Sequence, residues 1–206
     1  MTKPDKKDQI IAAAEKLFGG VGYDSTSVRD ICQEAKVNVA MINYYFGSKE
    51  GLLKEMIERK SLIMRGKLEA ILHNPNMNCH EKLRTAVEGM IERMFSHRPF
   101  TLSVIREMTK INQPEMRKMI LGLFLPNMEL MREIIKMGIR KKEFRKVDAE
   151  FTICSITGTS WHVISTGDLI LPGLEGSEIV TEDVLIYKER LLKHLNQLIQ
   201  NHLVIE

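Results

Sequence analysis

Apolar residues recur at intervals of three and four along almost the entire chain of 206 residues. This spacing places them on one face of a helix, whereas the alternation of apolar and polar residues that is typical of strands is scarce. Gly and Pro residues interrupt the pattern at only a few points. The sequence therefore predicts an all-α fold.

Three short helices are expected at the N-terminal end. The first ends at residues 19–22, and its apolar face comprises Ile10, Ala14, Leu17, Phe18 and Val21. The second begins after the capping candidates at residues 25–27, and a four-residue corner, 35–38, leads to a third helix that ends at Phe46. Two short helices joined by a tight corner are typical of a helix-turn-helix unit.

Longer helices are expected in the remainder of the chain, over residues 48–72, 78–96, 114–142, 148–165 and from 182 almost to the end. Pro126 should kink or restart its helix, and residues 167–181 should form a loop. Eleven of the 13 methionines lie beyond position 55. We therefore expect a DNA-binding domain over residues 1–55 and a second helical domain over residues 56–206.

A helix-turn-helix unit requires particular residue types at particular positions, and the sequence supplies them. Val28, Ile31 and Ala35 would pack the second helix, Val37 would fill the corner, and Ile42 and Phe46 would form the buried stripe of the third helix. Val39, Ala40, Asn43 and Tyr44 would then face a major groove. Asn38 can cap the third helix, whose N-terminus offers amide groups and a positive dipole to phosphate.

The segment from Ile10 to Leu53 resembles the TetR family of bacterial transcriptional regulators. Matching segments, in order and spacing, are residues 17–18, 22–23, 26–31 and 43–52. The resemblance implies a helix-turn-helix domain followed by a larger helical domain that binds an effector and dimerises. It also implies a homodimer that binds a double-stranded DNA operator.

Roles for individual residues follow from this resemblance. Base edges would be touched by Val39, Ala40 and Asn43, with Arg29 a further candidate, and phosphates by Tyr44, Tyr45, Lys49 and either Thr26 or Ser27. Each residue also has a purely structural alternative: one tyrosine can pack between helices, and Lys49, Asn43 and Arg29 can simply be solvated. The chain departs from the family pattern at three positions, with Lys36 in place of the corner glycine, Tyr45 where histidine is common and Asn43 where tyrosine is common. If Lys36 is left-handed, the cost is about 1 kcal/mol.

Charge does not by itself indicate a nucleic-acid partner. The whole chain has a net charge of +3, and residues 1–55 contain eight basic and eight acidic residues. Attraction to DNA must therefore come from the placement of charges and from helix termini, and weak non-specific binding is expected.

The second domain carries candidates for a dimer interface and an effector pocket. Interface candidates are Ile156, Ser160, Val163, Leu191, Leu195 and Leu198, and the alternative is the core of a monomer. Pocket candidates are Phe95, Phe100, Met108, Met119, Phe124, Met131, Trp161 and His162, which could equally be plain core, with His162 a hydrogen-bonded core histidine. An effector for such a pocket would be small and apolar or amphipathic.

The resemblance implies a ligand-responsive transcriptional regulator, a repressor released from a palindromic operator by its effector, with activation as the alternative to repression. A small helical enzyme is the main alternative, but we find no P-loop, GxSxG, HExxH or glycine-rich dinucleotide turn. A protein-binding adaptor without a DNA role is the other. No cofactor or metal site is predicted, since Cys79, His80 and His73 lack a second ligand pair. With no apolar run of about 18 residues and a polar N-terminus, we expect a cytoplasmic protein.

Overall fold

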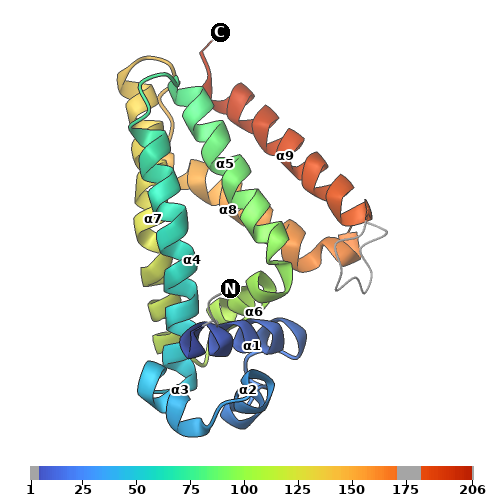
Figure 1. The fold of residues 1–206 in the computed structure, drawn as a ribbon. Coiled ribbons are helices and arrows are strands. Elements are labelled where there is room, and N and C mark those ends of the chain that lie inside the picture. The colour runs from blue at the N-terminus through green and yellow to red at the C-terminus, as the bar shows by residue number, and fades with distance from the viewer. Residues whose placement is uncertain (1–4, 171–181, 206) are drawn as a thin grey trace. The chain divides into compact units, whose positions relative to one another are not determined.

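The computed structural model describes residues 5–170 and 182–205, and within these ranges every regular element is a helix (Figure 1). The all-α prediction is confirmed. The helices are α1 (Lys6–Gly20), α2 (Val28–Ala35), α3 (Val39–Phe46), α4 (Lys49–Leu72), α5 (Cys79–Ser96), α6 (Arg98–Thr109), α7 (Pro114–Arg140), α8 (Ala149–Ile170) and α9 (Glu182–Leu203). None of these helices is both long enough and apolar enough to cross a membrane, over the residues described.

Several helix starts lie where capping chemistry predicts them. The Asn78 side chain accepts a hydrogen bond from the Glu81 amide, and the Glu81 carboxylate accepts one from the Asn78 amide, which completes the expected capping box of α5. Ser48 caps α4 through the amide of Gly51, at 2.9 Å. Asp148 caps α8 through the amide of Phe151, at 3.0 Å.

Two features of the middle of the chain differ from expectation. Helix α6, which begins at Arg98 and has Pro99 in its first turn, was not predicted as a separate element. Pro126 does not restart a helix, because α7 is continuous from Pro114 to Arg140. Proline there removes one N–H donor, but the remaining hydrogen bonds of the helix are enough to keep it continuous.

Helix α8 extends to Ile170, and the rest of the expected 167–181 loop lies outside the described residues.

The chain divides into two compact units. Unit 1 comprises residues 1–62 and 98–123, and unit 2 comprises residues 63–97 and 124–206. The expected single cut near residue 55 therefore differs from this division, which falls at residue 62 and adds α6 and the start of α7 to the N-terminal unit. The physical reason is that α6 packs along α1, a contact between segments about 80 residues apart that no local pattern reveals.

Unit 1 is built around α1, which contacts α2 on one side and α6 on another. At Gly19 the approach of α6 is close, because an added Cβ there would lie 2.8 Å from the Cβ of Pro99. Ion pairs also join α1 to α4, namely Lys7–Glu55, Asp8–Arg59 and Glu15–Lys60. The α4 hydroxyl of Ser61 donates to the carbonyl oxygen of Leu123 in α7, at 2.6 Å.

Unit 2 is formed by α5, α8 and α9 together with the C-terminal parts of α4 and α7. Each of α5, α8 and α9 contacts the other two, and their facing side chains are apolar and buried, including Ile91, Ile156 and Leu195 at 0% exposure. The end of α9 is fixed to the α7–α8 turn by the amide of Arg145, which donates to the carbonyl of Leu203 at 2.7 Å.

Candidate nucleic-acid interface

The start of α2 is fixed by a capping box. The Ser27 hydroxyl accepts from the Asp30 amide at 3.1 Å, and the Asp30 carboxylate accepts from the Ser27 amide at 2.7 Å. Hydrogen bonds from Ser27 to the Asp30 carboxylate, first from its side chain and then from its backbone amide, lower the pKa of Asp30. Ser27 is exposed, so its hydroxyl is accessible to a phosphate oxygen.

Thr26 cannot share that role. Its side chain is 1% exposed, and its hydroxyl donates to the carbonyl of Gly22 at 2.7 Å. Of the two expected alternatives, the structure therefore leaves Ser27 as the cap that can meet a phosphate, and it corrects the assignment of Thr26.

The corner between α2 and α3 is left-handed at Lys36, with φ 52° and ψ 49°. The amides of Lys36 and Val37 donate to carbonyls in the last turn of α2, and this pattern ends the helix. The cost of about 1 kcal/mol expected for a left-handed Lys36 therefore applies. A lysine occupies a conformation that glycine would adopt with less strain.

Helix α3 presents its polar and small residues outward. Asn38 is the N-cap and accepts from the amide of Met41 at 3.1 Å, as predicted. Ile42 is fully buried, whereas Ala40 and Asn43 are exposed and Val39 is 42% exposed. The first turn contains no acidic residue, so the positive end of the α3 dipole is not compensated within the helix.

The two tyrosines of α3 have different surroundings. Tyr44 is 84% exposed, and its ring meets the edge of Tyr45 with centroids 5.1 Å apart. Tyr45 is half-buried and also lies 6.0 Å from the ring of Phe46. The Tyr45 ring thus packs against its neighbours on α3, while the Tyr44 ring is accessible to a binding partner.

Lys49, expected to contact phosphate, has a second task in the structure. Its ammonium donates to the carbonyl oxygens of Tyr23 and Thr26, both at 2.9 Å, and lies over the Tyr23 ring. Burial, with smaller contributions from nearby carboxylates beginning with Glu50, raises the pKa of Tyr23. Since an ammonium has three N–H groups, one remains for a phosphate.

The charge of unit 1 differs from that of residues 1–55. Unit 1 contains fifteen basic and eleven acidic residues, a net charge of +4. Compared with residues 1–55, residues 56–62 add two basic and one acidic residue, and residues 98–123 add five basic and two acidic residues. Arg29 of α2 is exposed and forms no ion pair with any described residue. The compact unit is therefore more favourable to DNA than the N-terminal segment alone.

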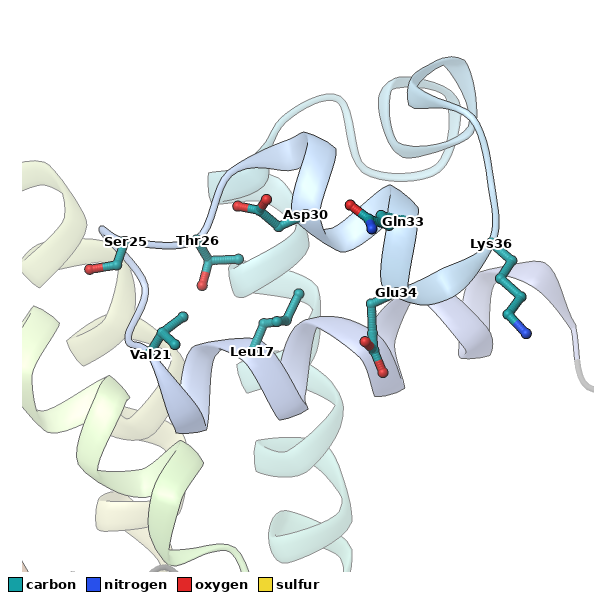
Figure 2. A pocket seen from close by; sticks show the side chains of 8 residues that line it. All are labelled: Leu17, Val21, Ser25, Thr26, Asp30, Gln33, Glu34 and Lys36. Carbon is teal, nitrogen blue, oxygen red and sulfur yellow. The ribbon is translucent and has the colours of Figure 1, made fainter.

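An open groove of about 740 Å³ lies between α1 and α2 (Figure 2). Leu17 of α1 and Val21, which directly follows α1, form one side, and Asp30, Gln33 and Glu34 of α2 line the other. Val21 is 61% exposed, so its expected place on the buried face of α1 is wrong. None of the residues expected to bind the effector lines this groove.

The expected effector residues divide between the two units. Phe100, Met108 and Met119 lie in unit 1, whereas Phe95, Phe124, Met131, Trp161 and His162 lie in unit 2. Phe100 is 5% exposed and lies beneath the Lys60 ammonium, which makes it part of the unit 1 core. His162 is exposed, with the Thr166 hydroxyl 3.5 Å from its Nδ1, so the alternative of a core histidine is wrong.

The expected dimer residues need a similar correction. Ile156, Ser160 and Leu195 are 0% exposed and Leu191 is 5% exposed within a single chain. They face the interior of unit 2 because α5 packs against both α8 and α9, a contact that helical spacing cannot reveal. Val163 and Leu198 remain partly accessible. On α8 the exposed stripe instead contains Phe151, Cys154, Ser155, Gly158 and His162.

A capped helix, a tight left-handed corner and a short helix with an exposed face together define a helix-turn-helix DNA-binding protein. Comparison with known proteins identifies the family. Residues 10–56 match the bacterial regulatory proteins of the tetR family, and residues 76–164 match the tetracyclin repressor-like C-terminal domain. The chain is 32% identical to the probable HTH-type transcriptional regulator YttP of Bacillus subtilis (strain 168) over 143 residues, 69% of each protein. It belongs to the TetR family of transcriptional regulators.

Solved structures agree on the fold. The fatty acid degradation regulator FadR from Bacillus halodurans superposes with a TM-score of 0.77 at 23% identity, covering 95% of this chain and 97% of that one. FadR from Bacillus subtilis, in complex with stearoyl-CoA, gives a TM-score of 0.75 at 21% identity, covering 91% and 96%. These TM-scores show that the chain shares the fold of both proteins.

Proposed function

We propose that this regulator is a repressor that binds a palindromic operator as a homodimer, with α3 in the major groove. The observation that carries the proposal is the outward face of α3, where Val39, Ala40, Asn43 and Tyr44 are exposed while Ile42 is buried. Asn43 reads a base edge, since a side-chain amide can both donate to and accept from adenine. Ser27, Asn38, Tyr44 and the third N–H of Lys49 contact phosphates on either side, and Arg29 is a further candidate for a base edge.

Dimerisation, in this proposal, uses the surfaces of α8 and α9 that α5 leaves open. Phe151 is 74% exposed in the single chain, and Gly158 on the same stripe allows close helix approach. On α9, Leu185 and Ile186 are 44% and 47% exposed. Large apolar side chains exposed on adjacent helices are typical of a surface that a partner covers.

The effector we propose is amphipathic, with a long apolar portion that enters unit 2. Support comes from the solved relative that binds stearoyl-CoA and from the apolar candidates within unit 2, namely Phe95, Phe124, Met131 and Trp161. Binding would favour a conformation in which the two α3 helices no longer match successive major grooves.

Selection from a randomised DNA pool tests the operator. The wild-type chain should enrich a sequence with two inverted half-sites centred about one helical turn apart. Enrichment of a sequence without symmetry would reject the homodimer, and no enrichment would reject the DNA role. Stearoyl-CoA should then release the selected duplex and change the fluorescence of Trp161, which is the only tryptophan. If stearoyl-CoA neither releases the duplex nor changes the Trp161 fluorescence, this effector class is rejected.

A further inference from the structure

The loop between α1 and α2, residues 21–27, is bound by a residue from outside the helix-turn-helix segment. The ammonium of Lys110, which directly follows α6, donates to the carboxylate of Asp24 in this loop. The same ammonium donates to both carboxylate oxygens of Glu107, at 2.7 Å each. Lys110 therefore bridges one carboxylate on α6 and one in the loop.

Glu107 fixes the position of this bridge. Its side chain is only 3% exposed, whereas Asp24 is 62% exposed. A buried carboxylate requires a charged partner, so Lys110 cannot leave Glu107 without a large cost. The lysine is thus a fixed anchor for the loop, unlike a surface lysine that samples many rotamers.

The loop in turn determines where α2 begins. Ser27, its last residue, is the N-cap of α2, and the amide of Thr26 donates to the Tyr23 carbonyl at 3.3 Å. Lys49 binds the same stretch from α4 through the carbonyls of Tyr23 and Thr26. A displacement of Asp24 would therefore move Ser27 and the helix that follows it.

We propose that Lys110, held by Glu107, is a positioning residue for DNA recognition, acting through Asp24 on the loop that precedes α2. The inference rests on the proposed DNA-binding function and extends it to α6. It assigns to α6 a direct part in the geometry of the DNA-binding surface. Neither Lys110 nor Glu107 needs to touch DNA for this role.

Substitution of Asp24 separates positioning from charge, because the two effects have opposite signs. Removing a carboxylate from a DNA-binding unit reduces repulsion of phosphates, so electrostatics alone predicts tighter binding. Loss of the bridge to Lys110 predicts weaker binding. Asp24→Lys sharpens the contrast, since it adds a cation favourable to DNA but places it against Lys110.

The matched control is Asp8, which is 59% exposed and pairs with Arg59 of α4 in the same unit. Asp8→Asn and Asp8→Lys make the same charge changes without touching the loop. Affinity would be measured for Asp24→Asn, Asp24→Lys, Asp8→Asn and Asp8→Lys, on the duplex selected by wild type and on a scrambled duplex. Hydrogen exchange of residues 21–30, measured without DNA, reports the order of the loop independently.

We expect Asp24→Asn to weaken binding to the selected duplex about 5-fold and Asp24→Lys to weaken it further, with faster exchange in residues 21–30. The Asp8 variants should bind as wild type or more tightly. In a Glu107→Gln/Lys110→Met background, where the bridge is already absent, Asp24→Asn should cause no further loss. Tighter binding by the Asp24 variants, or unchanged exchange, would overturn the inference. If wild type selects no duplex, the proposed function itself fails.

Discussion

The Lys49 ammonium lies 4.2 Å from the centroid of the Tyr23 ring and donates to the Tyr23 carbonyl oxygen at 2.9 Å. This pair joins the first residue of α4 to the loop between α1 and α2. The contact combines a cation over an aromatic face with a charge-assisted hydrogen bond. A lysine expected only to contact DNA therefore also stabilises the unit that carries it.

Replacement of Lys49 should consequently affect folding as well as DNA binding. We expect Lys49→Met to lower the free energy of unfolding by about 2 kcal/mol, because two half-buried carbonyls lose a charged donor. Denaturant unfolding without DNA measures this. Lys54→Met, an exposed lysine on the same helix, is the control and should change stability little. Unaltered stability in Lys49→Met, together with weaker DNA binding, would make Lys49 a phosphate contact alone.

Asn43 should discriminate between sequences. Asn43→Ala should cost about 1–3 kcal/mol on the selected duplex and almost nothing on a scrambled one, because an amide at a base edge is sensitive to sequence. The dependence of affinity on salt should not change, since no charge is lost. Gln33→Ala removes an exposed amide from α2 and serves as the control. Equal loss on both duplexes would show that Asn43 does not read a base.

The left-handed residues offer a test of backbone strain. Lys36 and Lys142 have φ of 52° and 59°, and both side chains are exposed. Replacing either by glycine should raise the free energy of unfolding by about 0.5–1 kcal/mol, because glycine adopts this conformation without a Cβ clash. Lys16→Gly, within α1, should instead lower it by about 1 kcal/mol. Thermal unfolding of the three variants checks the signs, and a loss of stability in Lys36→Gly would refute the strain argument.

The dimer proposal predicts different outcomes for exposed and buried positions. Phe151→Glu should give a folded monomer, because the side chain is open in the single chain and a carboxylate there opposes burial by a partner. Leu195→Glu should instead unfold unit 2, since that residue is 0% exposed. Light scattering and circular dichroism distinguish these results, with the exposed Lys136→Glu as control. A dimeric Phe151→Glu protein would place the interface elsewhere.

Local chemistry in the sequence was sufficient for most of the helix-turn-helix unit. Ser27 and Asn38 cap their helices as predicted, because an N-cap side chain and the amide it binds are separated by only three residues. The left-handed geometry at Lys36 was anticipated only through the family resemblance, because the family pattern has glycine at this corner. The outward face of α3 followed from helical periodicity, which assigned Ile42 and Phe46 to the buried side; Ile42 is fully buried and Phe46 is half-buried.

Contacts between distant segments could be decided only by the tertiary structure. Periodicity identifies an apolar face but not the helix that covers it, so Leu191 and Leu195 were assigned to a partner chain although α5 covers them. Thr26 is buried and Lys49 is bound because the α1–α2 loop meets α4, 23 residues further along the chain. The bridge from Lys110 to Asp24 spans 86 residues. The sequence by itself determined most of the helices and several of their caps, whose hydrogen bonds are local, whereas the packing partners of each face depended on the path of the whole chain.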